Sequence, residues 1–365
     1  MKSYRVIHFV SGGGAGSTKV AMALAFGHKE TNKFEPILIF RRKKKRDPSL
    51  INEIRTQGIP FAEVANKPKF LTIYQLVKLI KKYNPQILVA HGYSEHIWGR
   101  IAAILAKVPI IIQVEHNTEK YKPQHFWESR LLSKYTHKII CVSYGVKEYL
   151  VSLGFSPKNL QVIYNGIQVQ NYFSNQELPL LKRQLNIIMI ARFARQKDHT
   201  TLIKATHQLL EYPLNVLLVG GGKNAYRKKC EELVQKLGLQ DKILFLGKRT
   251  EIPELLAQNQ IFVLSTHYEG FGLVVVEAMI AGCIVIGSNV AGVSELIKDG
   301  ETGFLVPPND PITLAEKIKF IVNNPDLSAK IAKAGQEYAM ENFNLERMIH
   351  EYEELFLSEL KQQNL

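Results

Sequence analysis

Short, uniformly apolar runs recur along the whole chain and alternate with segments of helical character. Residues 110–112 (Ile-Ile-Ile) and 216–219 (Val-Leu-Leu-Val) are typical, because neither run alternates polar with apolar side chains. A strand of this kind is expected to be covered on both faces, as in a parallel sheet that has helices on either side. The sequence therefore predicts an α/β fold.

Two such series are separated by a polar, proline-bearing stretch from Asn171 to Gln184. A chain of 365 residues is long enough for two domains that each bury a core of their own. We expect residues 1–170 and 171–344 to form two domains, each a doubly wound, Rossmann-like parallel sheet.

The most specific motif is Glu269-Gly270-Phe271-Gly272-Leu273, followed by Glu277. The apolar run at 261–265 before it predicts a buried strand, and residues 273–281 predict a helix that Gly282 closes. A helix N-terminus offers free N–H groups and a partial positive charge, which suit a phosphate. The two glycines of the turn let a ligand approach the backbone closely.

Glu277 falls one turn inside this predicted helix, among neighbours that are nearly all apolar. A buried carboxylate needs a polar partner, because without one its burial costs several kcal/mol. The partner is an arginine, a group of backbone amides or a ligand. One interpretation is an internal salt bridge or a local cap, and the other is a carboxylate that accepts hydrogen bonds from sugar hydroxyls.

Two cations, Arg192 and Lys197, follow the predicted strand at 186–191. They stand five positions apart in one loop, at the edge of the sheet where open α/β folds bind ligands. Such a pair neutralises a pyrophosphate, although solvated surface cations give the same pattern. Asp198, directly after them, is expected to cap the helix that begins at residue 199.

A glycine-rich turn that includes Gly13 and Gly14 follows the first predicted strand at 4–10. The spacing fits neither the dinucleotide fingerprint, which needs a glycine where Ser17 or Lys19 stands, nor a P-loop. The remaining interpretation is a tight turn that lies close to a ligand or to a domain partner.

His91 and His116 lie just past the carboxyl ends of two further predicted strands. A single histidine at such a place is more often structural than functional. Two at equivalent strand ends favour a ligand-contacting role, more strongly for His116 than for His91.

The net charge of +14 is confined to the first half of the chain. Residues 1–170 carry 26 lysines and arginines against 10 acidic residues, and residues 171–365 carry 21 against 23. The run Arg41–Arg46 is six cations long and is expected to be a solvated loop or a contact to anionic lipid headgroups. The segment 70–83 adds an apolar face with lysines beside it, which either reinforces such a contact or packs on a sheet.

Three scattered cysteines, Cys141, Cys230 and Cys283, suit buried free thiols in a reducing compartment. No apolar run is long enough to span a membrane, and the N-terminus lacks a signal-peptide core. We therefore expect a cytoplasmic protein, with the basic run as a candidate peripheral contact to the inner face of the membrane.

The Glu-x7-Glu pattern with Gly-Phe-Gly inside it resembles the retaining, nucleotide-sugar-dependent glycosyltransferases of family GT4, of the bacterial surface-polysaccharide type. The likeness extends over nearly the whole chain and is strongest in residues 186–306. It implies the GT-B architecture, in which two Rossmann-like domains face each other across a cleft. It also implies that a C-terminal helix, about residues 345–365, completes the first, acceptor-side domain.

The resemblance implies a hexosyltransferase with a UDP-sugar donor and a glycan or lipid-linked acceptor, although no residue here selects uridine over guanosine or adenosine. It places Glu269 on the donor sugar, Glu277 on the ribose, and Arg192 and Lys197 on the pyrophosphate. It places His116 beside the transferred sugar. In this family the turn at 270–273 lines the donor site, and the loop with Gly13 and Gly14 contacts donor phosphate or acceptor.

Metal-dependent transferases of this kind usually carry an Asp-x-Asp pair, and no two of the six aspartates here stand two apart. We therefore expect Arg192, Lys197 and the helix N-terminus at 271–273 to stabilise the negative charge of the leaving phosphate. We predict that no metal or other cofactor is required.

Two alternatives from other classes remain. A sugar-nucleotide epimerase of the same architecture would convert the donor without an acceptor. A nucleic-acid-binding protein would use the basic first half and would bind with a steep salt dependence, although the chain contains no recognised nucleic-acid module.

Overall fold

The computed structural model describes residues 3–13, 16–43, 48–92, 94–118, 123–172, 178–222 and 224–364. The chain forms two compact units. Unit 1 comprises Met1–Gly166 and Leu345–Leu365, and unit 2 comprises Ile167–Asn344. The first boundary thus lies four residues before the one expected at residue 170.

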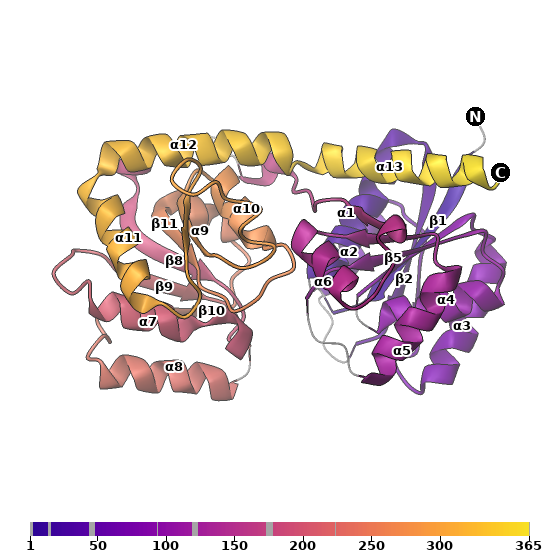
Figure 1. Ribbon diagram of the computed structural model, residues 1–365, viewed down its shortest axis with the longest axis horizontal. Helices are drawn as coiled ribbons and strands as arrows, with labels where there is room; N and C mark the ends of the chain where they lie inside the picture. The colour runs from indigo at the N-terminus through magenta and orange to yellow at the C-terminus, as the bar shows by residue number, and fades with distance from the viewer. Residues whose placement is uncertain are drawn as a thin grey trace. The chain divides into compact units, whose positions relative to one another are not determined.

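Unit 1, which is indigo to magenta with the yellow α13 in Figure 1, contains a seven-stranded sheet. The strand order is β3-β2-β1-β4-β5-β6-β7, and every neighbouring pair is parallel. Its strands are β1 (Tyr4–Ser11), β2 (Phe34–Arg41), β3 (Phe61–Val64), β4 (Ile87–His91), β5 (Ile110–Glu115), β6 (Lys138–Cys141) and β7 (Leu160–Val162). Its helices are α1 (Gly16–Thr31), α2 (Pro48–Thr56), α3 (Lys69–Tyr83), α4 (Glu95–Leu105), α5 (Pro123–Leu132), α6 (Tyr144–Ser152) and α13 (Leu345–Gln362).

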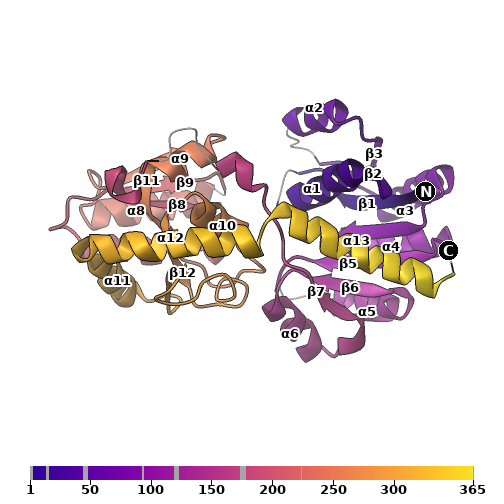
Figure 2. The same ribbon diagram turned by 90° about the horizontal axis from the view of Figure 1, so that it is seen from above.

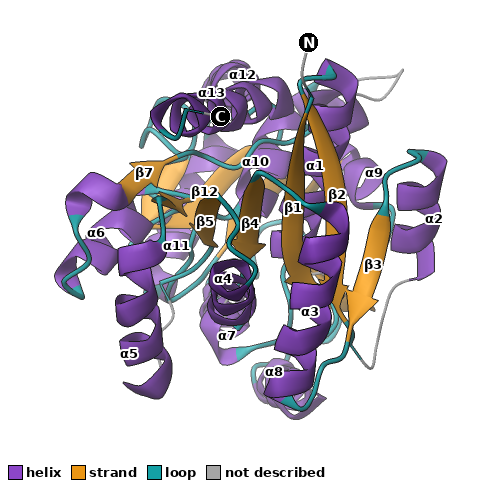
Figure 3. Cartoon of the chain, turned by 90° about the vertical axis from the view of Figure 1, so that its right-hand side faces the viewer, coloured by secondary structure: helices purple, strands orange, loops and turns teal. Residues whose placement is uncertain are grey.

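Both faces of this sheet are covered, as the uniformly apolar strands predict. Odd-numbered residues of β1, such as Ile7 and Phe9, pack with α3 and α4. Val10, on the other face, packs with residues of α1 and α2. Figure 3 shows the strands of unit 1 between these two helical layers.

The C-terminal helix α13 packs on α1 in unit 1 (Figure 2). A side chain at Gly27 of α1 would overlap Ile349 of α13, so the two helices approach closely at this glycine. Glu353 of α13 is buried and accepts hydrogen bonds from Thr31 and from Lys33, the latter at 2.9 Å. These contacts tie the end of the chain to its beginning.

Unit 2 contains a six-stranded parallel sheet in the order β10-β9-β8-β11-β12-β13. Its strands are β8 (Gln184–Ile190), β9 (Val216–Val219), β10 (Ile243–Gly247), β11 (Asn259–Leu264), β12 (Ile284–Ser288) and β13 (Phe304–Val306). Its helices are α7 (His199–His207), α8 (Asn224–Lys236), α9 (Ile252–Gln258), α10 (Leu273–Ile280), α11 (Pro311–Asn323) and α12 (Pro325–Asn342).

The three cysteines are buried free thiols, as expected. Burial raises the pKa of each thiol to about 12. Within the described residues, every helix is too short or too polar to cross a bilayer.

Candidate functional site

The centre of the unit 2 sheet is the point where its strand order reverses. β8 and β11 are neighbours, but the chain continues from β8 to β9 on one side and from β11 to β12 on the other. The loops that leave two such strands diverge, and the crevice outside their carboxyl ends is where open α/β sheets bind ligands. Residues 191–198 follow β8 and residues 265–272 follow β11, so both predicted donor-site segments lie at this point.

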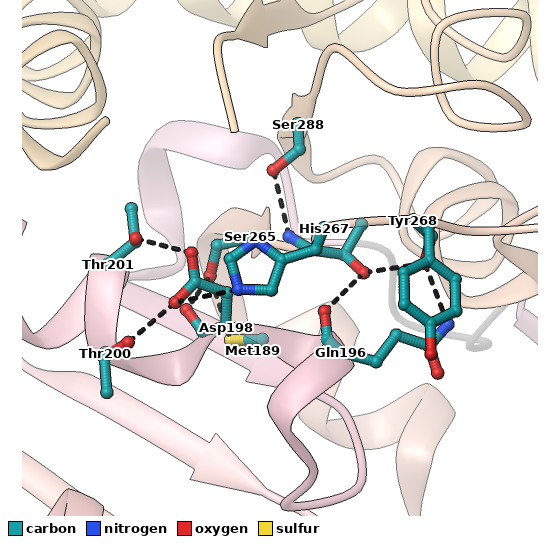
Figure 4. Close-up of polar contacts among 10 residues, drawn as sticks. Met189, Gln196, Asp198, Thr200, Thr201, Ser265, His267, Tyr268 and Ser288 are labelled. Atoms are coloured by element: carbon teal, nitrogen blue, oxygen red, sulfur yellow. Dashed lines mark hydrogen bonds and ion pairs between the residues drawn. The ribbon is translucent and has the colours of Figure 1, made fainter. Parts of the chain in front are cut away.

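Side-chain hydrogen bonds join these two loops to each other (Figure 4). The Ser265 hydroxyl donates to the Asp198 carbonyl oxygen at 2.9 Å, and the Thr266 hydroxyl donates to the Gln196 carbonyl oxygen at 3.0 Å. In return, the Gln196 amide donates to the carbonyl oxygen of Tyr268 at 2.8 Å. The loops therefore hold a fixed position relative to each other.

The Asp198 side chain does not cap α7 through a backbone N–H, contrary to expectation. It accepts hydrogen bonds from the hydroxyls of Thr200, at 2.7 Å, and Thr201, at 2.6 Å. These hydroxyls come within reach in the first turn of the helix and satisfy the buried carboxylate. Asp198 thus fixes the end of the loop that carries Lys197.

Lys197 and Glu269 form an ion pair between the two loops. Their side chains are 13% and 17% exposed, so each retains access to solvent. The sequence predicts a ligand-binding role for each residue separately, and the structure brings the two into contact.

The Gly-Phe-Gly turn leads into α10 as expected. Gly272 is the residue before the helix and has φ +88°, a left-handed conformation that favours glycine. Gly270 and Phe271 are buried, and Leu273 begins α10.

Gly292, in the loop after β12, supports this turn and has no role in the sequence prediction. A Cβ atom at Gly292 would stand 2.6 Å from the carbonyl oxygens of Glu269 and Gly270. Only a glycine at this position lets the turn lie where it does. The sequence feature that could have identified Gly292 is the Ala-Gly pair that follows a predicted strand.

Glu277 lies half-buried in α10, and its carboxylate forms a hydrogen bond with the hydroxyl of Tyr172. Tyr172 ends the short helix η3 (Val169–Tyr172), which packs on α10. Burial first, and the Glu277 carboxylate second, raise the pKa of the Tyr172 phenol. The expected polar partner of Glu277 thus includes a tyrosine from the start of unit 2, which the sequence reasoning missed.

Arg192 is exposed in the loop after β8. Two glycines at the end of β9 hold this loop. A side chain at Gly220 would overlap the carbonyl oxygen of Ala191, and the Phe193 N–H donates to the Gly221 carbonyl oxygen at 2.7 Å. The Gly-Gly-Gly run after β9 therefore lets the backbones of the two loops pack together.

Unit 1 also gathers its predicted residues at the carboxyl edge of its sheet. His91 ends β4 and is fully buried, and His116 directly follows β5 and is half-buried. Nδ1 of His91 lies 3.4 Å from Nε2 of His116, so the two histidines are in contact. Gly13 is exposed in the turn after β1, and Gly14 lies outside the described residues.

The expectation that the run Arg41–Arg46 is wholly solvated is wrong for its first member. Arg41 ends β2, and its guanidinium is buried against Glu95, 2.6 Å from Oε1, and against Asn66, 2.8 Å from Oδ1. It also lies 4.8 Å from the ring centroid of Trp98. A carboxylate, an amide and an aromatic face together satisfy the buried charge. Arg42 is exposed, and residues 44–46 lie outside the described part of the chain.

The broad apolar face expected for the segment 70–83 mostly packs on the sheet. Leu76 and Ile80 of α3 are buried in the core of unit 1, whereas Phe70 and Tyr74 are exposed. Across the described residues, no three His, Cys, Asp or Glu side chains are grouped so as to hold a metal ion.

Two family descriptions match the chain. "Glycosyltransferase Family 4" matches residues 15–171, and "Glycosyl transferases group 1" matches residues 173–338.

Three curated relatives show the range of the similarity. The chain is 30% identical to an uncharacterized glycosyltransferase of Methanocaldococcus jannaschii, over 71% of this chain and 72% of that protein. It is 30% identical to the N-acetyl-alpha-D-glucosaminyl L-malate synthase of Bacillus anthracis, over 56% of this chain and 55% of that protein. It is 25% identical to the UDP-Gal:alpha-D-GlcNAc-diphosphoundecaprenol alpha-1,3-galactosyltransferase of Escherichia coli, over 78% of this chain and 79% of that protein.

Solved structures share the fold. Anabaena HepE, crystallised with UDP and glucose, superimposes with a TM-score of 0.87 at 21% identity, over 97% of this chain and all of that one. A glycosyltransferase from Rickettsia africae superimposes with a TM-score of 0.86 at 24% identity, over 99% of this chain and all of that one. With the two parallel-sheet units, the two family matches and the Methanocaldococcus relative, the chain belongs to the GT4 glycosyltransferases of the GT-B fold.

Proposed function

We propose that this protein is a retaining hexosyltransferase that moves a sugar from a UDP-linked donor to a glycan or lipid-linked acceptor. The observation that carries the proposal is the Lys197–Glu269 pair at the reversal point of the unit 2 sheet, next to the N-terminus of α10. A carboxylate for sugar hydroxyls, a cation for phosphate and a helix N-terminus are the groups that a nucleotide-diphosphate sugar requires.

The leaving group is a diphosphate, and its negative charge grows as the bond to the sugar breaks. In the proposal, Arg192, Lys197 and the N–H groups at the start of α10 stabilise that charge. The acceptor oxygen forms its bond to the anomeric carbon on the face from which phosphate leaves, and its proton passes to the leaving phosphate oxygen. Configuration is thereby retained.

The choice of UDP is supported by the relatives. HepE crystals contain UDP-glucose, and the name of the E. coli relative specifies UDP-Gal as donor and a diphosphoundecaprenol-linked sugar as acceptor. The Staphylococcus aureus relative CapM is named for capsular polysaccharide biosynthesis. The matched relatives favour neither an epimerase nor a nucleic-acid-binding protein.

A thermal-shift panel of UDP-, GDP- and ADP-sugars tests the donor. A ligand at one hundred times its Kd stabilises the folded protein by about 2.7 kcal/mol, so the true donor raises Tm more than the other sugars do.

Incubation of the protein with that donor and a polyprenyl-diphosphate sugar should then yield a product whose anomeric coupling constant matches that of the donor. An inverted product, or an altered nucleotide sugar formed without acceptor, would refute the proposal. Turnover should persist in EDTA, since the proposal assigns no role to a metal.

We further propose that unit 1 acts as a peripheral contact to anionic lipid at the inner face of the cytoplasmic membrane. Phe70 and Tyr74 of α3 and Trp127 and Leu131 of α5 are each at least 60% exposed. An ion pair of 2.8 Å between Lys69 of α3 and a glutamate of α5 brings the two helices together. Exposed aromatic side chains on a strongly basic unit suit the headgroup region of an anionic bilayer.

Co-sedimentation with vesicles tests this contact. The wild type should bind vesicles that contain phosphatidylglycerol and should not bind pure phosphatidylcholine. The double variant F70S/W127S should lose most of this binding, while Leu210→Ser, an exposed leucine of unit 2, should leave it unchanged. Equal binding by all three proteins would refute the membrane contact.

A further inference from the structure

Three histidines of unit 1 lie on a diagonal across three neighbouring strands. His8 of β1 stands opposite Val89 of β4, and His91 lies two residues further along β4. His91 in turn stands opposite Val114 of β5, and His116 lies two residues further along the chain. Because a step of two residues returns to the same face of a strand, all three side chains share one face and approach the carboxyl edge of the sheet. We call them the histidine row.

Hydrogen-bond contacts link the row from end to end. Nδ1 of His8 lies 3.2 Å from Nε2 of His91, and Nδ1 of His91 lies 3.4 Å from Nε2 of His116. His8 and His91 are fully buried. Burial lowers the pKa of both well below 6.5 and the pKa of His116 to about 4, so the three rings are neutral near pH 7.

A row of neutral imidazoles has only two arrangements that satisfy both contacts, because each contact needs one N–H and one lone pair. In the first, His8 and His91 each donate from Nδ1, and His116 accepts at Nε2 and carries its own proton on Nδ1. In the second arrangement, all three rings carry their proton on Nε2, and Nδ1 of His116 is unprotonated. The tautomer of His116 is therefore coupled to that of His8.

The buried end of the row decides between these arrangements. Nε2 of His8 has no hydrogen-bond partner among the described residues. The ring of His28, from α1, stacks on His8 with 5.5 Å between the ring centroids and covers it. The second arrangement would leave an N–H at this position without an acceptor, and orphaned buried N–H groups are rarer in proteins than under-satisfied acceptors. The first arrangement leaves only an unpaired lone pair.

We infer that His8 and His91 are positioning residues that hold His116 with its proton on Nδ1. His116 then offers an N–H to an oxygen of the bound substrate and is unavailable as a base at that atom. The link to substrate depends on the proposed glycosyl transfer, but the tautomer itself does not.

Nitrogen NMR of protein labelled with ¹⁵N-histidine, without substrate and at pH 7.5, reads the tautomer directly. Variants in which one histidine at a time is replaced assign each resonance to its residue. His116 should show a protonated Nδ1 and a bare Nε2. A protonated Nε2 on His116 would overturn the inference, whether or not any sugar transfer is ever detected.

Two variants of His8 test the coupling. His8→Asn places an amide N–H near the position of the lost Nδ1 and should preserve both the His116 tautomer and kcat. His8→Leu removes the donor, so His116 should show mixed tautomers and kcat should fall about tenfold with an unchanged KM for the donor. Phe9→Leu shortens the adjacent core side chain on the opposite face and should change neither quantity. A His8→Leu protein with the wild-type tautomer would overturn the inference. If His8→Leu does not fold, the spectra of the wild type and of His8→Asn still decide it.

Discussion

The Lys197 ammonium and the Glu269 carboxylate form an ion pair between two loops whose residues stand 72 positions apart in the sequence. The pair exists because β8 and β11 are neighbours at the centre of the unit 2 sheet. Hydrogen bonds from Gln196 and Thr266 fix the distance between the loops (Figure 4). A cation and a carboxylate are thus prepared together before a ligand arrives.

Lys197→Met and Glu269→Gln should each lower kcat/KM about a hundredfold or more, the loss typical when one preorganised charge-stabilising group is removed. Since the two side chains act as a unit, the double variant should lose far less than the product of the two single effects. A double-mutant cycle on kcat/KM measures this. Strictly multiplicative losses would show that the pair has no joint role.

Arg192→Ala should lower kcat without reducing Tm, because Arg192 is exposed in the loop after β8 and its expected partner is the leaving diphosphate. Arg195→Ala is the matched control, since Arg195 is also exposed in that loop and has no role in the proposed site. Steady-state kinetics of the two variants should differ by at least tenfold in kcat. Equal kcat values would remove Arg192 from the mechanism.

Glu277→Gln should weaken donor binding about tenfold, equivalent to about 1.4 kcal/mol, because a neutral amide is a weaker acceptor for ribose hydroxyls. Tyr172→Phe removes the hydroxyl that bonds to Glu277 but keeps the carboxylate, so it should change the Kd far less. Calorimetric titration with UDP measures both. Wild-type affinity in Glu277→Gln would show that the carboxylate serves only the tyrosine.

Gly292→Ala should reduce donor affinity and activity strongly, because the new methyl group would push on the carbonyl oxygens of Glu269 and Gly270. Gly300→Ala is matched in backbone strain, with φ +75° against +83°, but its Cβ would have no atom within 4 Å. Gly292→Ala should therefore lose more stability than Gly300→Ala, because it adds a clash with backbone to the same strain, and only Gly292→Ala should lose UDP binding. Parallel loss of binding in both would trace the effect to strain alone.

The stability of unit 1 should fall as pH decreases from 6.5 to 4. Burial lowers the folded-state pKa of His8, His91 and His116, so the unfolded chain binds more protons in this window. Each such histidine lowers the free energy of unfolding by about 1.4 kcal/mol for each pH unit below 6.5, until the pH reaches its folded-state pKa. Its contribution to stability is fully present above pH 6.5. Urea unfolding monitored by tryptophan fluorescence reports on unit 1, because Trp98 and Trp127, the two tryptophans of the chain, both belong to it.

The variant His8→Asn removes one of these groups and should flatten the slope. His350→Gln changes a histidine of α13 whose side chain is 64% exposed, so it should leave the slope as in the wild type. Identical slopes in all three proteins would contradict the assignment of this pH dependence to the row.

The sequence predicted most strands and the Gly-Phe-Gly turn well, because these depend on local hydrophobic pattern and on turn chemistry. β3 and α5 had no such prediction: β3 is only four residues long, and α5 has no clear apolar face. The two segments that the sequence assigns to a donor site do lie together at one sheet edge, since each follows a strand of the same parallel sheet.

Contacts between distant residues were beyond the sequence. Arg41 reads as one of six solvated cations, yet Glu95 and Trp98 surround it. Tyr172 and Gly292 had no predicted role, because their roles depend on which loop lies against which.

By itself, the sequence determined that the chain forms parallel α/β units and which loops carry charge and glycine at the carboxyl edges of their sheets, because residue periodicity and backbone preference are local. Only the tertiary structure decided that Lys197 meets Glu269 and that His8, His91 and His116 form a row. Both follow from strand order and register, which are set by the packing of the whole sheet.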